Sequence, residues 1–495
     1  MKSFDLILKS SFIVFLGIIL SRVLGYFFRI IVARHDMEIY GSYIFALFSS
    51  QFILPFIMLG LGSGLLRYMG YYQGKKRDYK VDLGITSALK VVFTLSLILC
   101  AIFYYFSPDI ALFFNKPSAL PFLKAFAFLI PISAFTNLFS VILRAHHKIT
   151  SYIFATNILV GILEIIFLLI FFRPGFIEEG LIISILASSF IALIFLIFFS
   201  RSLFIFRYQK FDREVIDFSL PLLPGSFLFS FITLTDTLIL GYFASVKDVA
   251  LYNVALPTSQ IILVFLTAFL TVFLPIISNK YALKKDFTKD YKFVIKWISL
   301  LTFPFLLSIM LFRSEVIRVL FGEDYVLASG PLVLLTLSYF FYCFSAPAGN
   351  VLTMLNRTRE AFWVAFGTFS INLILNLILI PLSVNYLGTG VHGAALATTI
   401  SLLFLAVTTF LLIYKYSTLK LFYNFHPKIL FAGLVSTFFV YLINKYIFSA
   451  DGFIALVIAY LIFIAIYLIL IFFVGLIDKK DISLIISFFK LFKKN

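Results

Sequence analysis

The chain has 495 residues, of which 62% are hydrophobic and 13% are charged, and its formal net charge is +17. A soluble domain carries about 25% charged residues, so this composition excludes an ordinary water-soluble fold. The positive charge does not indicate nucleic-acid binding, because the basic residues fall in short segments between long apolar runs. The sequence therefore predicts an integral membrane protein without a soluble domain.

About fourteen apolar segments follow one another, each near the roughly 20 residues that cross a bilayer as a helix. In lipid every backbone N–H and C=O must be paired internally, which leaves helices or closed barrels. A barrel would alternate in polarity over about ten residues, whereas these runs are continuous. We predict an all-α protein with transmembrane helices at residues 11–33, 40–66, 84–106, 120–143, 150–172, 180–200, 218–243, 249–275, 293–312, 329–349, 361–381, 391–413, 428–447 and 453–475.

Basic residues are unevenly shared between the connections that join these spans. They gather in every second connection, such as residues 67–80, 201–213 and 280–292, and at both ends of the chain. Because Lys and Arg are retained on the cytoplasmic side, we place both termini in the cytoplasm and the protein in the cytoplasmic (inner) membrane. Residues 478–495 mix charge with Leu, Ile and Phe, which fits either an amphipathic helix on the inner leaflet or a frayed basic tail.

A weak internal repeat divides the chain. Residues 40–46 open the second predicted helix, and the similar residues 250–255 open the eighth. Six helices per copy is an even number, so both copies insert the same way up and are related by a pseudo-two-fold axis along the membrane normal. We expect an N-lobe of helices 1–6 at 1–213, a C-lobe of helices 7–12 at 214–415, and two further helices with an amphipathic tail at 416–495.

Two arginines stand out in the first span, because a charge near a helix centre costs about 2.5–3.5 kcal/mol. Arg22 and Arg29 are seven residues apart, almost two helical turns, so both project from one face with Gly25 between them. Their planar guanidinium groups suit phosphate oxygens, and Gly25 leaves room for a ligand, so we predict a pyrophosphate-binding site. In the alternative, Arg29 reaches the outer interface and Arg22 pairs with an acid on another helix.

Two carboxylates lie in other spans. Glu164 is in the fifth, two turns after Asn157, and Asp236 is in the seventh. Each would serve ion coupling or gating, with H+ or Na+ as the ion, or form a buried pair with an arginine of the first span. Asn372 and Asn376 share a face of the eleventh span, where we expect them to hydrogen-bond neighbouring helices. Three residues are expected to line a cavity: Gly25, Asn157 and Asn253.

Motifs of catalysis are absent from the sequence. It contains no phosphate-binding loop for nucleotides, no zinc-protease motif and no nucleophilic-serine motif. Its connections are too short to form a catalytic domain. We therefore expect a transporter rather than an enzyme, with no cofactor, no metal centre and no nucleic-acid partner.

Several short segments together carry a family resemblance: residues 21–26, 31–34, 40–43, 219–222, 234–241 and 319–325. In this order they resemble the MOP flippase superfamily, and most closely its polysaccharide transporter (Wzx-like) family. The resemblance implies a MATE-like fold whose first and seventh helices line a cavity open alternately to each side. It implies a flippase for a polyprenyl-pyrophosphate-linked oligosaccharide in surface glycan biosynthesis. Its partners would be the lipid-linked glycan, membrane lipid and the glycan polymerase and glycosyltransferases of the pathway.

The first helix departs from one branch of that superfamily. Lipid II flippases usually place two arginines six residues apart with an acid after the second, whereas here the spacing is seven and Ile30 follows Arg29. Two other functions stay open: an ion-coupled multidrug or cation antiporter of the same superfamily, and a membrane enzyme of polysaccharide assembly. An antiporter typically has twelve helices, and an enzyme a large outer loop, but the longest outer connection here spans about residues 313–328.

Overall fold

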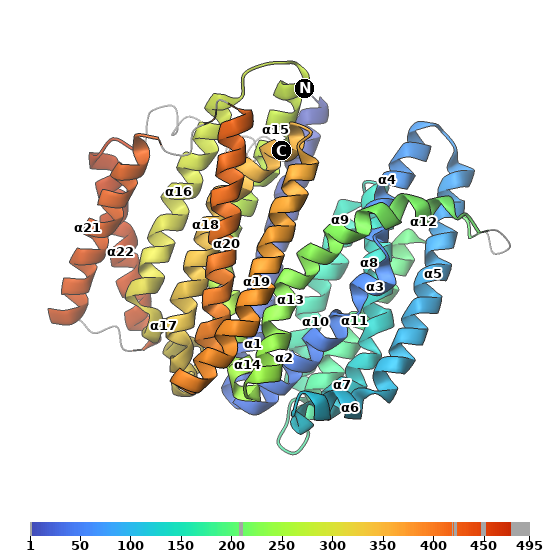
Figure 1. The fold of residues 1–495 in the computed structure, drawn as a ribbon, viewed down its shortest axis with the longest axis horizontal. Coiled ribbons are helices and arrows are strands. Elements are labelled where there is room, and N and C mark those ends of the chain that lie inside the picture. The colour runs from blue at the N-terminus through green and yellow to red at the C-terminus, as the bar shows by residue number, and fades with distance from the viewer. Residues whose placement is uncertain (1, 207–210, 418, 420–422, 447–451, 477–495) are drawn as a thin grey trace. The chain divides into compact units, whose positions relative to one another are not determined.

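The computed structural model describes residues 2–206, 211–417, 419, 423–446 and 452–476, and all regular secondary structure within them is helical (Figure 1). The predicted amphipathic tail lies outside the described residues. Continuous apolar runs become helices because only a helix pairs every backbone group within a single span.

The chain forms two compact units, of which unit 1 is Met1–Pro257 with Ala365–Ser401 and unit 2 is Thr258–Val364 with Leu402–Asn495. The lobe boundaries expected from the internal repeat stay a prediction. The helices up to Ser259 are α1 (Lys2–His35), α2 (Met37–Gln51), α3 (Leu54–Met58), α4 (Leu61–Gly74), α5 (Asp78–Tyr105), α6 (Ser107–Phe113), η1 (Pro117–Ala119), α7 (Leu120–Ala127), α8 (Leu129–Ala145), α9 (Ile149–Ile153), η2 (Phe154–Leu159), α10 (Val160–Phe171), α11 (Ile177–Ser200), α12 (Glu214–Ser219), η3 (Leu220–Leu222), α13 (Leu223–Phe243) and α14 (Val246–Ser259). They are followed by η4 (Gln260–Ile262), α15 (Leu263–Ala282), α16 (Thr288–Leu311), α17 (Arg313–Phe321), η5 (Glu323–Ala328), α18 (Ser329–Met354), α19 (Thr358–Leu387), α20 (Val391–Tyr416), α21 (Phe425–Tyr446) and α22 (Phe453–Phe473).

Most of these helices have the length and composition of membrane spans. Among the described residues, 11 helices are long and apolar enough to cross a membrane, or up to 12 if a pair bent by 46°, Pro117–Ala127 with Leu129–Ala145, is one span. Together with the long helices α1 and α13, this is roughly consistent with the predicted number. The prediction of an all-helical, multi-spanning membrane protein is confirmed.

The second predicted span is interrupted. It consists of α2, α3 and α4, and the chain turns between α3 and α4 at Leu59 and Gly60, whose φ angles are 44° and 77°. A Cβ atom at Gly60 would collide with the backbone carbonyl of Ser219. Glycine is therefore required here twice, for its positive φ and for the close approach of the residue that ends α12.

Lipid, rather than water, suits the surface of both units. In unit 1 Leu169 is 67% exposed, and in unit 2 Phe473 is 80% exposed. Large polar aromatics lie inside instead: Tyr40 and Tyr252 in unit 1 are fully buried. The hydrophobic effect cannot separate inside from outside in a bilayer, so packing and hydrogen bonds define the interior.

In unit 2 the last two helices pair with each other and pack on α16, as the red helices of Figure 1 show. Gly433 on α21 meets Phe303 on α16, whose ring carbon would lie 2.7 Å from an added Cβ. The hydroxyl of Tyr467 on α22 donates a hydrogen bond to the carbonyl of Leu300 at 3.0 Å. Within unit 2, the two C-terminal helices are thus held to α16 by a small residue and a buried hydrogen bond.

Candidate functional site

The first helix packs closely on the fifth predicted span. In unit 1, α1 contacts α9, η2 and α10. Gly17 of α1 faces Ile153, and Gly161 of α10 faces Leu24, whose Cβ would lie 2.9 Å from a Cβ added at Gly161. Because each helix presents a glycine at a contact point, their backbones come close together.

Between these two contacts the helix changes its pitch. η2 is a π-helical turn, and Asn157 lies within it with a half-buried side chain. The turn runs directly into α10, which carries Glu164. A π-helical turn holds one residue more than an α-helical turn, so its presence decides which side of α10 faces α1.

Arg29 lies among polar residues of two neighbouring helices. It interacts electrostatically with Tyr40 and Tyr43 of α2 and with Glu164 of α10, and its contact with Tyr40 is a hydrogen bond. Arg29 and Glu164 therefore interact electrostatically, while their predicted roles in pyrophosphate binding and in ion coupling or gating stay predictions. Arg22 is half-buried on the same helix.

Gly25 has open space beside it, and its predicted place in a cavity lining stays a prediction. A Cβ atom added at Gly25 would meet no other atom within 4 Å. This contrasts with Gly17 and Gly161, where a Cβ would clash with the facing helix. The open space lies on the part of α1 between Arg22 and Arg29, where an anion could reach guanidinium groups.

Asp236 accepts hydrogen bonds from three helices at the centre of a buried polar cluster. Its Oδ2 accepts from the hydroxyls of Tyr252 on α14 and Thr398 on α20, each at 2.7 Å. Its Oδ1 accepts from the amide of Asn376 on α19 at 2.5 Å. All three donors are neutral, and Asp236 is 3% exposed.

Buried amide groups around Asp236 retain unused bonding capacity. The Asn376 amide also donates to Oδ1 of Asn372 at 3.2 Å. Within the described part of the chain, three buried amide atoms have no hydrogen-bond partner: Asn253 Oδ1, Asn376 Oδ1 and Asn372 Nδ2. Carboxylate, hydroxyl and amide oxygens are the ligands of hard cations, so this cluster has the chemistry to hold Na+ or a proton.

The two segments of the internal repeat contact each other at α2 and α14. The hydroxyl of Tyr40 donates to the backbone carbonyl of Asn253 at 3.1 Å. Gly41 lies so close to Val246 that a Cβ would collide with the Val246 carbonyl. The Asn253 side chain is fully buried and donates to the hydroxyl of Thr237 at 3.2 Å, so its expected place in a cavity lining stays a prediction.

A second contact involves Lys116, in a predicted outer connection. Lys116 is 4% exposed, and its ammonium donates to the carbonyl of Ala244 at 2.6 Å. Burial lowers the pKa of Lys116, and the nearby Asp248 partly offsets this effect. Asp248 in turn accepts from the Ser245 backbone at 2.9 Å and from the hydroxyl of Thr389. These bonds join the turn after α6 to the connections beside α13 and α20.

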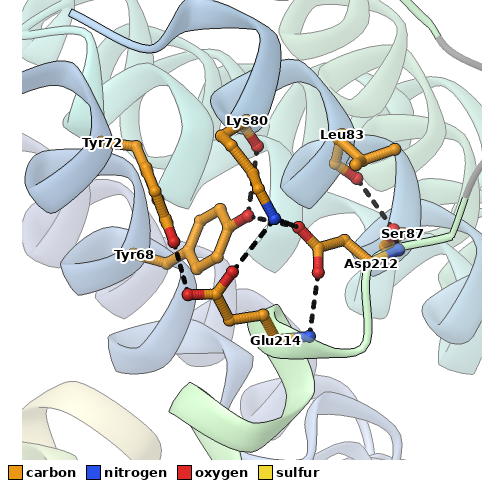
Figure 2. A network of polar contacts seen from close by, with 7 residues as sticks. All are labelled: Tyr68, Tyr72, Lys80, Leu83, Ser87, Asp212 and Glu214. Atoms are coloured by element: carbon orange, nitrogen blue, oxygen red, sulfur yellow. Dashed lines mark hydrogen bonds and ion pairs between the residues drawn. The ribbon is translucent and has the colours of Figure 1, made fainter. Parts of the chain in front are cut away.

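A third polar group ties the connection before α12 to α4 and α5 (Figure 2). Lys80 bonds Asp212 at 2.8 Å and Glu214 at 3.1 Å, while Tyr68 donates to Asp212 at 2.8 Å and Tyr72 donates to Glu214. Burial tends to raise the pKa of Asp212, but hydrogen bonds from Lys80, Tyr68 and the Glu214 backbone outweigh it and hold that pKa below its ordinary value.

Sequence reasoning identified the buried charges but missed most of their partners. Tyr252 and Thr398 donate hydrogen bonds to Asp236, and Tyr40 is hydrogen-bonded to Arg29, yet the sequence predicted none of these three residues as a partner of a buried charge. As predicted, Asn376 hydrogen-bonds a neighbouring helix. The available signal was polarity inside spans: hydroxyl residues at buried positions of several helices have to bond something.

Comparison with known proteins identifies the family to which the chain belongs. Residues 40–329, more than half of it, match the family described as polysaccharide biosynthesis protein. An uncharacterized membrane protein of Methanocaldococcus jannaschii is 23% identical over 79% of this chain and 80% of its own. A protein named probable low-salt glycan biosynthesis flippase, from Haloferax volcanii, is 27% identical over 36% of each chain.

Solved structures share the fold. The lipid II flippase MurJ in its inward closed conformation has a TM-score of 0.77 and 19% identity, over 94% of this chain and 99% of its own. An inward-facing multidrug resistance MATE family transporter of the MOP superfamily has a TM-score of 0.66 and 17% identity, over 80% and 94%. The MATE-like fold expected from the resemblance is confirmed. The chain belongs to the polysaccharide biosynthesis protein family and has the fold of the MOP flippase superfamily.

Proposed function

We propose that this protein is a flippase that moves a polyprenyl-pyrophosphate-linked oligosaccharide across the cytoplasmic membrane by alternating access, for surface glycan biosynthesis. The observation that carries the proposal is the cationic face of α1, where open space at Gly25 lies between Arg22 and Arg29. Membership of the polysaccharide biosynthesis family supports a glycan as the cargo.

The arginines bind the pyrophosphate, while the glycan enters the polar interior and the lipid tail stays in the bilayer. Arg29 interacts electrostatically with Glu164. An arriving pyrophosphate offers stronger, bidentate acceptors and takes Arg29 from Glu164. Glu164 therefore acts as a gate: it competes with the substrate anion for Arg29 and releases the arginine only to that anion.

Cation binding at Asp236 drives the cycle. Its carboxylate accepts from the neutral donors Tyr252, Thr398 and Asn376, so none of these bonds cancels its charge. An uncompensated carboxylate in a membrane interior favours a bound proton or Na+. The ion gradient then supplies the free energy that moves the substrate outward.

Alternating access requires a contact that closes one side. Under the topology that the basic residues predict, with both termini in the cytoplasm, Lys116 lies on the outer side. Its buried bond to Ala244 supports an outer gate that is closed in this conformation. Opening breaks this bond and the close contact of Gly41 with Val246.

An ion-coupled drug or cation antiporter is the second candidate function. It is favoured by the buried Asp236 and by the shared fold with a multidrug transporter. An antiporter would expose an acidic surface to a cationic drug, and it would have no use for arginines in α1. The two functions differ in which charge the substrate carries.

A leaflet assay tests the flippase. Lipid-linked glycans are extracted from a strain that lacks the gene, after intact spheroplasts are treated with a membrane-impermeant glycan-modifying enzyme. We expect glycan to accumulate in protected form, and to be released by the wild-type gene but not by Arg22→Ala. Glycan that reaches the outer leaflet normally in the deletion strain would refute the flippase and leave the antiporter.

A further inference from the structure

The contact between α2 and α14 connects the polar residues around Arg29 with those around Asp236, all of them in unit 1. Tyr40 bonds Arg29 on one side and the Asn253 carbonyl, at 3.1 Å, on the other. The residue before Asn253 is Tyr252, whose hydroxyl donates to Asp236 at 2.7 Å. Two adjacent residues of α14 therefore link the groups: Tyr252 contacts Asp236, and Asn253 contacts Tyr40, the partner of Arg29.

A parallel link runs through the side chain of Asn253. Its amide donates to the hydroxyl of Thr237 at 3.2 Å, and Thr237 directly follows Asp236 on α13. Tyr40, Tyr252, Asn253 and Thr237 are all fully buried. Leaving a buried polar group without its hydrogen-bond partner costs about 1–3 kcal/mol of free energy, because neither water nor lipid replaces the bond. Each link therefore resists breaking unless its neighbours change.

We propose that Tyr40 and Asn253 are positioning residues that couple binding of a monovalent cation at Asp236 to binding of pyrophosphate beside Arg29. This proposal rests on the proposed function and adds the route of coupling. A cation on Asp236 competes with the Tyr252 hydroxyl for the carboxylate and shifts α14. A pyrophosphate competes with the Tyr40 hydroxyl for Arg29 and so changes the contacts that position α2.

Both ligands thus act on one bistable element, the pairing of α2 with α14. In this conformation the pairing is close, since the backbone of Val246 fills the place of a side chain at Gly41. When the two helices separate, the bond from Tyr40 to Asn253 breaks. A ligand that favours either state of the pair changes the affinity of the other ligand by the same factor, because coupling free energies are reciprocal.

Binding measurements on the full-length protein in lipid nanodiscs test the coupling. The probes are farnesyl pyrophosphate, Na+ exchanged against choline at constant ionic strength, and buffer pH at constant Na+. In the wild type we expect one of the two cations to change the dissociation constant of farnesyl pyrophosphate by about 5- to 150-fold, the usual range of allosteric coupling. Tyr40→Phe should bring that factor close to one while the variant still binds each ligand.

Two further variants locate the effect. Thr237→Val keeps the contact of Tyr40 with Arg29 but removes the acceptor on α13, and leaves the Asn253 amide only the Val249 carbonyl of its own helix, at 3.0 Å, so it too should reduce the coupling factor. It also provides the result if Tyr40→Phe does not fold. Ser42→Ala is the matched control, because it removes one buried hydroxyl from the same helix whose bond goes to Ser118 instead. This control should keep the wild-type factor.

The inference is overturned if Tyr40→Phe and Thr237→Val keep the wild-type factor. It is also overturned if neither Na+ nor pH changes farnesyl pyrophosphate affinity in the wild type. Either result leaves the flippase standing, since that proposal fails only when the deletion strain delivers glycan normally to the outer leaflet. The two failures are therefore distinguishable.

Discussion

Glu164 and Asp236, the carboxylates found inside two spans of unit 1, have opposite surroundings. Glu164 faces a cation, Arg29, whereas Asp236 accepts only from neutral groups such as Tyr252 and Asn376. A carboxylate beside a guanidinium is neutralised and changes partner only when another anion arrives. One among neutral donors has no fixed counter-charge, so its charged form is costly until a proton or another cation neutralises it. We therefore expect the partner, and not the residue type, to assign the role of a buried acid.

The largest expected effect comes from removing the charge at Asp236. Asp236→Asn keeps the size of the side chain but removes the anion that holds the cation, so ion-driven transport should fall by on the order of 100-fold, a coupling of about 3 kcal/mol. Glycan delivery to the outer leaflet measures it. Farnesyl pyrophosphate binding should be retained and should lose its dependence on Na+ and pH. Undiminished transport in this variant would show that Asp236 does not couple an ion.

The next largest effect concerns Arg29, the cation beside Glu164. Arg29→Gln removes a charge-assisted interaction worth about 1.5–3 kcal/mol, so farnesyl pyrophosphate should bind about 10- to 100-fold more weakly. Isothermal titration in nanodiscs measures the affinity. Lys80→Gln, which removes a cation from a different part of unit 1, serves as the control. Equal affinity in wild type and a folded Arg29→Gln would remove Arg29 from the pyrophosphate site.

A smaller effect of opposite sign should follow from Glu164→Gln. This change removes the competitor for Arg29, so farnesyl pyrophosphate should bind more tightly, by about 5-fold or 1 kcal/mol. Transport should slow at the same time, because release of the substrate no longer has an anion to displace it. The same titration, combined with the leaflet assay, checks both outcomes. Weaker binding in Glu164→Gln would mean that Glu164 supports the site instead of competing in it.

The smallest effect concerns a third carboxylate, Asp212, which lies outside the spans. Its pKa in the folded protein is below the ordinary 3.8, so it stabilises the fold above about pH 4 and loses this contribution as the pH falls through the folded value. Asp212→Asn should lower stability by about 1 kcal/mol near neutral pH, with no difference from wild type in strong acid.

Scanning fluorimetry in detergent measures this difference across a pH series. Asp78→Asn, at an exposed position at the start of α5, is the matched control for the loss of one carboxylate. A difference in unfolding temperature between Asp212→Asn and the wild type that persists unchanged in strong acid would mean that the carboxylate contributes through packing and not through its charge.

The spans of this protein were predictable because lipid leaves the backbone few choices. Breaks inside spans were not: at the turn that Gly60 forms, the residue Ser219, far away in sequence, leaves no room for a side chain. The bend after Ala127 is likewise invisible in an apolar run. Apolar patterning reports where a helix can exist, while close contacts with distant segments decide where it stops.

The buried charges were predictable as positions but only partly as pairs. The cost of a charge in lipid singles out Arg29, Glu164 and Asp236 from the sequence. Their partners lie up to 162 residues away, as in the bond from Thr398 to Asp236. Hydroxyl and amide residues are common in spans and carry no charge to mark them, so only the folded chain shows which of them contact Asp236.

The π-helical turn η2 has a consequence for how this span tolerates changes in length. A π-helical turn accommodates one extra residue, so deleting one residue within Phe154–Leu159 would restore a regular α-helix and leave α10 with the same side facing α1. Substitutions that remove the π turn without changing the length of the chain would instead rotate everything after it by about 100° and turn Glu164 away from Arg29. In an evolving gene, this turn can therefore absorb a lost codon that a regular span cannot.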